Sequence, residues 1–172
     1  MEQMESKIIK LKKLFFIPDP GKLCRLPYPG HKKGCPNLGK SLLCPPNAPK
    51  LIDKYDLSKP CYFIVQPFNI SAQKEKMKKL HHDWSDRQCA CCLYWQNGVR
   101  KELKERSEIE CMVIGGRLYA NGIIPFSGLV NFELIPEAMG LNVFSTTRYH
   151  GIYMVRNPQE ILYKIAFVGV LK

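Results

Sequence analysis

The alternation of apolar and polar residues along the chain predicts a small sheet. Residues 59–68 (KPCYFIVQPF) form a short apolar run rich in aromatic and β-branched residues, and residues 160–171 (EILYKIAFVGVL) place large apolar side chains at every second position. Both patterns are typical of buried strands. Residues 110–116 (ECMVIGG) and 151–155 (GIYMV) predict two shorter strands, and residues 7–17 (KIIKLKKLFFI) fit either a strand or a short helix.

A different periodicity in the middle of the chain predicts a long helix over residues 85–107. The sequence SDRQ at its start has the form of a capping box, with Ser85 as N-cap and Gln88 three residues on. Positions 89, 92, 96, 99 and 103 then follow helical spacing along one stripe, which places Cys89 and Cys92 one turn apart on the same face.

Two shorter helices are expected on either side of it. Residues 70–81 show helical spacing with several lysines, and Ser71 is suited to cap this helix. Asn142 is suited to begin another, and Gly151 stands where a left-handed glycine commonly ends a helix. The sheet and short helix of residues 110–172, with two or three helices in all, indicate an α/β or α+β fold.

Residues 18–50 interrupt these patterns. They contain eight prolines and four glycines, and they read as a loop. A loop of this length is unusual in a compact domain unless it has a function or an internal staple. We therefore expect residues 1–172 to form a single compact domain, in which this Cys/Pro-rich segment is a metal-binding loop.

Composition indicates the cellular compartment of the chain, and the compartment decides how its eight cysteines are interpreted. The chain has 172 residues, of which 45% are hydrophobic, so it is long and apolar enough to build a core. It shows no secretory signal pattern and no apolar stretch long enough to span a membrane. These features favour the cytoplasm, where cysteines stay reduced and clusters of them more often bind metals than form disulfides.

The net charge of +11 is concentrated in the first third of the chain. Residues 1–50 carry ten lysines and arginines against three acidic residues. Such a surface attracts anions, including nucleic acid. It would equally compensate the charge of cysteine thiolates, since four thiolates on a 2+ cluster core leave a net charge of −2. Nucleic-acid binding is the weaker interpretation, because aromatic residues do not alternate with these lysines as stacking platforms require.

The strongest chemical signal is the segment GCPNLGKSLLCPPNAP. Cys24, Cys35 and Cys44 are separated by ten and eight residues, and proline follows the last two directly. Zinc sites commonly use tighter C-x(2–4)-C pairs, whereas iron–sulfur ligands tolerate wide spacing and a following proline. Proline also restricts the backbone before any metal binds, which lowers the entropy lost on binding.

Three loop cysteines and one helix cysteine would complete a ligand set. We predict a [4Fe–4S] cluster held by Cys24, Cys35, Cys44 and Cys92. Tetrahedral zinc satisfies the same count. The fourth ligand has three alternatives: Cys61, Cys89 and Cys111. These three cysteines and Cys91 could also form a second site.

The same residues resemble a known family. The segment CRLPYPGHKKGCPNLGKSLLCPPNAP is similar to the signature of an uncharacterised cysteine-rich family of predicted metal-binding proteins, which carries a GCPNxGKxxxCPPxAP-like stretch. Residues 92–103 and 135–152 also look like later segments of that family. The resemblance implies a metal or iron–sulfur site at Cys24, Cys35, Cys44 and Cys92. It implies no reaction.

The sequence leaves three functions as alternatives. The first is a cytosolic iron–sulfur protein that transfers electrons or supports a partner enzyme. The second is a zinc-stapled basic module that binds nucleic acid. The third is an enzyme with an open iron–sulfur site, in which the loop supplies three cysteines and substrate takes the free position.

Overall fold

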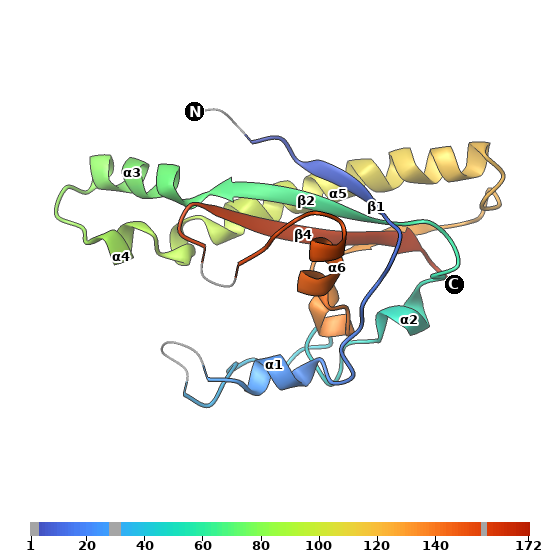
Figure 1. Cartoon of the computed structure of the whole chain (residues 1–172), viewed down its shortest axis with the longest axis horizontal. Coiled ribbons are helices and arrows are strands. Elements are labelled where there is room, and N and C mark those ends of the chain that lie inside the picture. The colour runs from blue at the N-terminus through green and yellow to red at the C-terminus, as the bar shows by residue number, and fades with distance from the viewer. Residues whose placement is uncertain (1–3, 28–31, 156–157) are drawn as a thin grey trace.

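A four-stranded antiparallel sheet is the centre of the fold. The computed structural model describes residues 4–27, 32–155 and 158–172. Its strands are β1 (Lys7–Leu11), β2 (Cys61–Asn69), β3 (Val130–Glu133) and β4 (Ile161–Val170), in the order β1-β2-β4-β3. Every strand pairing is antiparallel and the helices lie outside the sheet, so the fold is α+β (Figure 1). This is one of the two fold classes that the sequence predicts.

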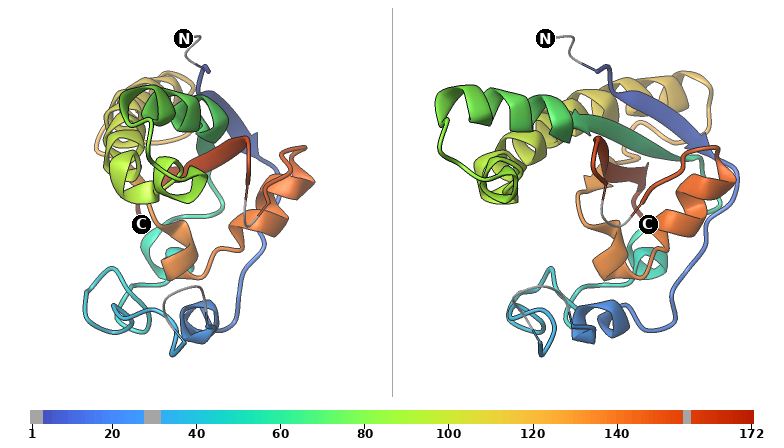
Figure 2. Two further views of the ribbon diagram at one scale, coloured as in Figure 1. Left: turned by 90° about the vertical axis from the view of Figure 1, so that its left-hand side faces the viewer. Right: turned by 60° about the vertical axis from the view of Figure 1, so that its left-hand side comes forward.

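Helices cover both faces of this sheet. α5 lies along one face, while α2 and α6 lie on the other, where the segment containing α1 continues away from the sheet (Figures 1 and 2). The helices among the described residues are α1 (Gly21–Arg25), α2 (Leu51–Lys54), α3 (Ile70–Leu80), α4 (Asp86–Cys89), α5 (Gln96–Ala120) and α6 (Val143–Tyr149), with short 3-10 turns η1 (Cys92–Tyr94) and η2 (Pro136–Met139). None of the helices in the described ranges is long and apolar enough to cross a membrane.

Alternate residues of β2 and β4 build two hydrophobic cores. Phe63 pairs with Phe167 and faces the side of α2 and α6, where Tyr55 packs edge-on against Phe167. Ile64 and Ala166 point to the opposite side and pack against α5. Period-2 alternation of side chains therefore explains why the two central strands are apolar on both faces.

The two longest predicted strands are confirmed, and two of the shorter ones are wrong. Residues 59–68 and 160–171 correspond to β2 and β4, and residues 7–17 begin with β1 rather than a helix. Residues 151–155 form no regular element. Residues 110–116 are helical, because a short apolar run cannot by itself distinguish a strand from part of a buried helix.

The predicted helix over residues 85–107 is also wrong in its boundaries. α4 ends at Cys89, Cys91 lies outside both helices, and α5 begins only at Gln96 and runs on to Ala120. Tertiary packing explains the break: Trp95 stacks on Phe68 of β2 at 4.6 Å, and its indole N–H donates to the carbonyl of Ala90. Cys89 is consequently buried while Cys92 is exposed, so the two do not share one face.

The predicted helix signals at residues 85, 142 and 151 are confirmed. The Asn142 side chain accepts a hydrogen bond from the Ser145 amide at the start of α6, and Gly151 follows that helix with φ of 81°. The helix after β2 begins at Ile70 rather than after Ser71, because Asn69 provides the cap. Ser85 and Gln88 form the complete capping box.

Replacing Ser85 with alanine is expected to cost about 1 kcal/mol, because it removes the side-chain acceptor of the Gln88 amide. The measurement is the free energy of unfolding by urea. Ser127→Ala, at an exposed turn after α5, is the control and is expected to change stability little. Equal stability of the two variants would contradict a role for the box.

Candidate metal centre

The cysteine loop, residues 18–50, is docked on the fold at its beginning. The amide of Ile17 donates to the carbonyl of Gly140 at 2.8 Å, and the amide of Asn142 donates to the carbonyl of Phe15 at 2.7 Å. These bonds hold the entry to the loop against the turn between η2 and α6. The loop therefore starts from a fixed position on the side of the sheet that α6 covers.

Cys24 and Cys35 are joined through their backbones. Cys24 is the fourth residue of α1, and its carbonyl accepts a hydrogen bond of 2.7 Å from the amide of Cys35. Gly34 makes this close approach possible: its φ is 84°, and a Cβ atom there would lie 2.4 Å from the carbonyl oxygen of Cys24. Only glycine fits both conditions.

Cys44 is held by a second set of turns within the loop. The amide of Gly39 donates to the carbonyl of Pro45 at 3.0 Å, and the side-chain amide of Asn47 donates to the carbonyl of Gly39 at 2.9 Å. The peptide bond between Pro45 and Pro46 is cis. Residues 39–47 thus close on themselves around Cys44, whose carbonyl accepts from the amide of Ala48.

The charges of Cys35 and Cys44 act on the thiol of Cys24. Burial raises the pKa of the Cys24 thiol, and negative charge on Cys35 and then on Cys44 raises this pKa further, while Arg25 opposes the shift. All three cysteines are partly buried. A cation bound near these thiolates would relieve that repulsion.

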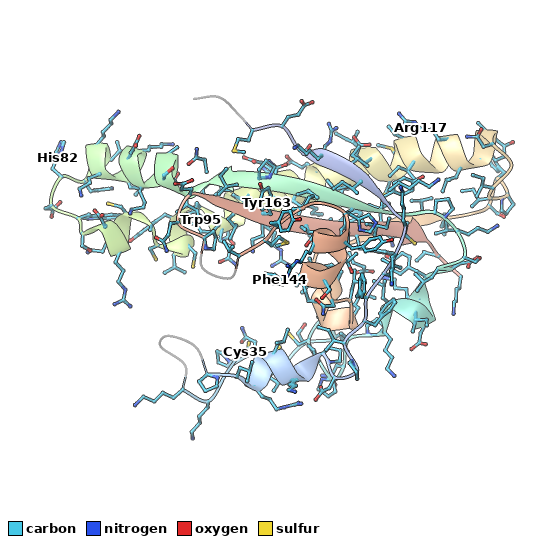
Figure 3. All side chains as sticks on the ribbon, viewed as in Figure 1. Cys35, His82, Trp95, Arg117, Phe144 and Tyr163 are labelled. Carbon is cyan, nitrogen blue, oxygen red and sulfur yellow. The ribbon has the colours of Figure 1, made fainter. Side chains whose placement is uncertain are left out.

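Cys92, the predicted fourth ligand, lies outside this group. It is exposed on η1, and no contact joins it to the loop thiols among the described residues. Figure 3 shows Cys35 well separated from Trp95, which marks the end of η1. Within the described part of the chain, no set of three or more histidine, cysteine, aspartate or glutamate side chains is arranged as a metal-ion site.

Cys61 and Cys111, two of the alternative ligands, are core residues. Burial raises the pKa of each thiol to about 11, with smaller contributions from Asp56 and Glu110 respectively. Neutral thiols are poor metal ligands, because the thiolate is the form that binds. Cys89, the third alternative, is fully buried beneath Trp84. The structure therefore brings none of these three to the loop thiols.

The raised pKa values of Cys61 and Cys111 predict an alkaline loss of stability. Each thiol has a higher pKa folded than its value of 9.0 outside the fold, so the stability it contributes is complete below pH 9 and is lost as pH rises toward about 11. We expect the thermal unfolding midpoint to fall over that range. The double variant Cys61→Ala, Cys111→Ala should decline less steeply, and an identical decline would contradict the assignment.

The surface of the loop is basic and carries exposed leucines. It has six positive residues (Lys22, Arg25, Lys32, Lys33, Lys40 and Lys50) against Asp19 alone, a net charge of +5. Arg25 pairs with Asp19. Leu42 is 80% exposed, and Leu23, Leu26 and Leu43 are also exposed. Apolar side chains set among lysines around a thiol group are suited to contact with another macromolecule.

A buried polar cluster next to the loop was not predicted. Tyr55 is fully buried, and its hydroxyl donates to Glu133 at 2.9 Å; Lys54 pairs with the same carboxylate oxygen. Burial and the Glu133 charge raise the pKa of Tyr55 above its usual range. The only sequence signal was a lone glutamate at the end of a short apolar segment.

Comparison with protein families, curated proteins and solved structures finds no match to this chain. The resemblance of the cysteine segment to a family of predicted metal-binding proteins therefore stays a prediction. The function of the chain is accordingly inferred from the geometry of the loop.

Proposed function

We propose that the protein is a cytosolic iron–sulfur protein that binds one [4Fe–4S] cluster through Cys24, Cys35 and Cys44. The observation that carries this proposal is the hydrogen bond between the backbones of Cys35 and Cys24, together with the charges of Cys35 and Cys44 that act on the Cys24 thiol. Proline and positive-φ glycine restrict the loop that contains all three cysteines. Wide spacing and proline after the ligand favour a cluster over mononuclear zinc.

The donor set suits such a group. Three sulfur atoms from one restrained segment would hold three corners of the cluster, and five surplus positive charges in the loop would balance the charge of the thiolates. When bound, the cluster supplies one-electron transfer or a Lewis-acidic iron. The chain itself supplies the ligands, their restrained backbone and the positive surface.

The position of Cys92 favours one of the three alternative functions. Because Cys92 is exposed on η1 and outside the group of loop thiols, one coordination position is left to a ligand from outside the loop. This is the arrangement of an open site, in which substrate or a partner completes the coordination. We therefore favour the open iron–sulfur site over a closed cluster of four cysteines.

A protein partner is proposed for the exposed face of the loop. Leu42 and Leu43 are 80% and 57% exposed and lie beside Lys40. An acidic surface would match the lysines, and the leucines would lose contact with water on binding. Nucleic acid is the alternative ligand for the positively charged face of the loop. Its binding would weaken steeply with added salt.

Reduction of the protein tests this proposal. Anaerobically purified protein should show a broad visible absorption band that bleaches reversibly on addition of dithionite. A zinc-bound protein would show neither the band nor the bleaching, since zinc has no redox chemistry. Reversible bleaching that changes when a small thiol is added would support the open position, and insensitivity to added thiols would indicate four protein ligands.

A further inference from the structure

A cavity of about 200 Å³ lies between the end of the cysteine loop and the edge strand β3. Its apolar walls come from separate parts of the chain: Leu43 and Pro49 of the loop, Phe132 of β3, and Met139 of η2. The loop therefore forms one wall directly beside Cys44. A mainly apolar cavity with a few polar groups is the usual form of a small-molecule site.

Three charged side chains line this cavity: Lys54, Glu133 and Arg100. The Glu133 side chain is only 14% exposed, and it is already paired with Lys54 and with the Tyr55 hydroxyl. Arg100 takes part in no side-chain hydrogen bond or ion pair with any described residue. Two cations face one carboxylate, so the cavity carries a surplus charge of +1, located at Arg100.

A second cavity of about 290 Å³ adjoins the first. The two share Arg100, Leu134 and Ile135, so Arg100, an exposed residue of α5, lies where they meet. Its other charged groups are Lys164 and Glu137, and burial raises the pKa of Glu137. Positive charge therefore exceeds negative charge here as well, and apolar residues again form most of the wall.

We propose that these adjoining cavities bind a small organic acid, with its carboxylate on Arg100 and its apolar chain between the cysteine loop and β3. A guanidinium is well matched to a carboxylate, which it can contact through two parallel hydrogen bonds. The surplus of one positive charge fits a monoanion better than a phosphate dianion. The apolar walls require a ligand that carries hydrocarbon as well as charge.

The proposal stands apart from metal binding, because none of the charged groups that carry it is a cysteine. It places the apolar chain of the ligand beside Leu43, which is next to Cys44 in the sequence. An acid bound there would touch Leu43 and so would stabilise one side of the loop that carries the thiols.

Calorimetric titration of the full chain, as purified, with acetate, butanoate and hexanoate tests the site. One molecule should bind per chain, and each added methylene should strengthen binding by about three- to fourfold until the cavity is filled. Hexanol, which lacks the charge, should bind about tenfold more weakly than hexanoate or worse. Equal affinity for hexanol and hexanoate, or no detectable hexanoate binding, would overturn the proposal.

Two variants with opposite expected effects separate binding from general damage. Arg100→Gln should weaken hexanoate binding by about tenfold or more, since a charge-assisted contact is lost. Glu133→Gln should strengthen it, because the amide still accepts from Tyr55 while Lys54 is freed to attract the ligand. A merely structural role of these residues would weaken binding in both.

Arg117→Gln is the matched control, because Arg117 lies toward the other end of α5, away from the cysteine loop (Figure 3). It should leave hexanoate affinity unchanged, and an Arg100→Gln protein that binds as tightly as this control would refute the assignment. Metal content is measured in every variant. Intact metal with no hexanoate binding would refute only this inference, whereas hexanoate binding without metal would refute only the proposed function.

Discussion

Serine in place of Cys35 or Cys44 is expected to abolish metal binding and to expose residues 18–50 to protease. Each substitution removes one of the two cysteines whose charge acts on the Cys24 thiol, and serine is a poor replacement for a thiolate ligand. The staple that holds the loop would be lost together with the metal. The measurements are iron content and the rate of limited proteolysis of the purified variants.

Two further cysteine variants serve as comparisons. Cys111→Ala removes a half-buried thiol from the middle of α5 and should retain the full metal content. Cys92→Ser tests the predicted fourth ligand directly, and the structure leads us to expect that it also keeps its metal. Full metal content in both Cys35→Ser and Cys44→Ser would remove the basis of the proposed centre.

Alanine at Gly34 is expected to cause nearly as large a loss without touching a ligand. The added Cβ would lie 2.4 Å from the Cys24 carbonyl oxygen and 2.9 Å from the Arg25 carbonyl carbon. Both atoms belong to the backbone, so no side chain can move aside. The hydrogen bond between Cys35 and Cys24 should break, and the protein should lose most of its bound metal.

Two other glycines separate the causes of this loss. Gly39 has φ of 73°, and a Cβ atom there would make only an ordinary contact of 3.9 Å with Pro46, so Gly39→Ala should cost about 1–2 kcal/mol from the backbone conformation alone. Gly116 lies within α5 with no atom near its Cβ position, so Gly116→Ala should stabilise the protein by about 0.5–1 kcal/mol. Metal content should be highest in Gly116→Ala, lower in Gly39→Ala and lowest in Gly34→Ala. Equal metal content in all three would contradict the close packing of the loop.

The elements that could be predicted are those with strong local signals. β2 and β4 are continuous apolar runs with β-branched residues, and the Ser85 and Asn142 caps depend only on neighbouring positions. Such features are decided by the chain within a few residues. They do not depend on how distant segments meet.

The errors occurred where distant contacts decide the structure. Trp95 packs on Phe68, 27 positions away in the sequence, and this contact accompanies the break between α4 and α5. Residues 110–116 belong to a helix whose length no local signal revealed, and of these residues only Glu110 and Ile114 are buried. Tertiary packing overrides local preference at both places.

The sequence predicts which residues form the candidate site, but it does not predict their geometry. The proline-flanked cysteines predicted the loop as the candidate segment. The charges of Cys35 and Cys44 act on the Cys24 thiol, but no group of three such side chains among the described residues is arranged as a metal-ion site. Cys92 was assigned by extending a helical stripe through a position where the helix is broken. The cavity at Arg100 joins β3, α5 and the loop, and no local pattern could have indicated it.

The most direct test of the central proposal is the iron and acid-labile sulfide content of the anaerobically purified protein. Binding of a [4Fe–4S] cluster by the loop predicts about four iron and four sulfide per chain. Zinc at one atom per chain without sulfide, or a protein that retains no metal at all, would contradict it.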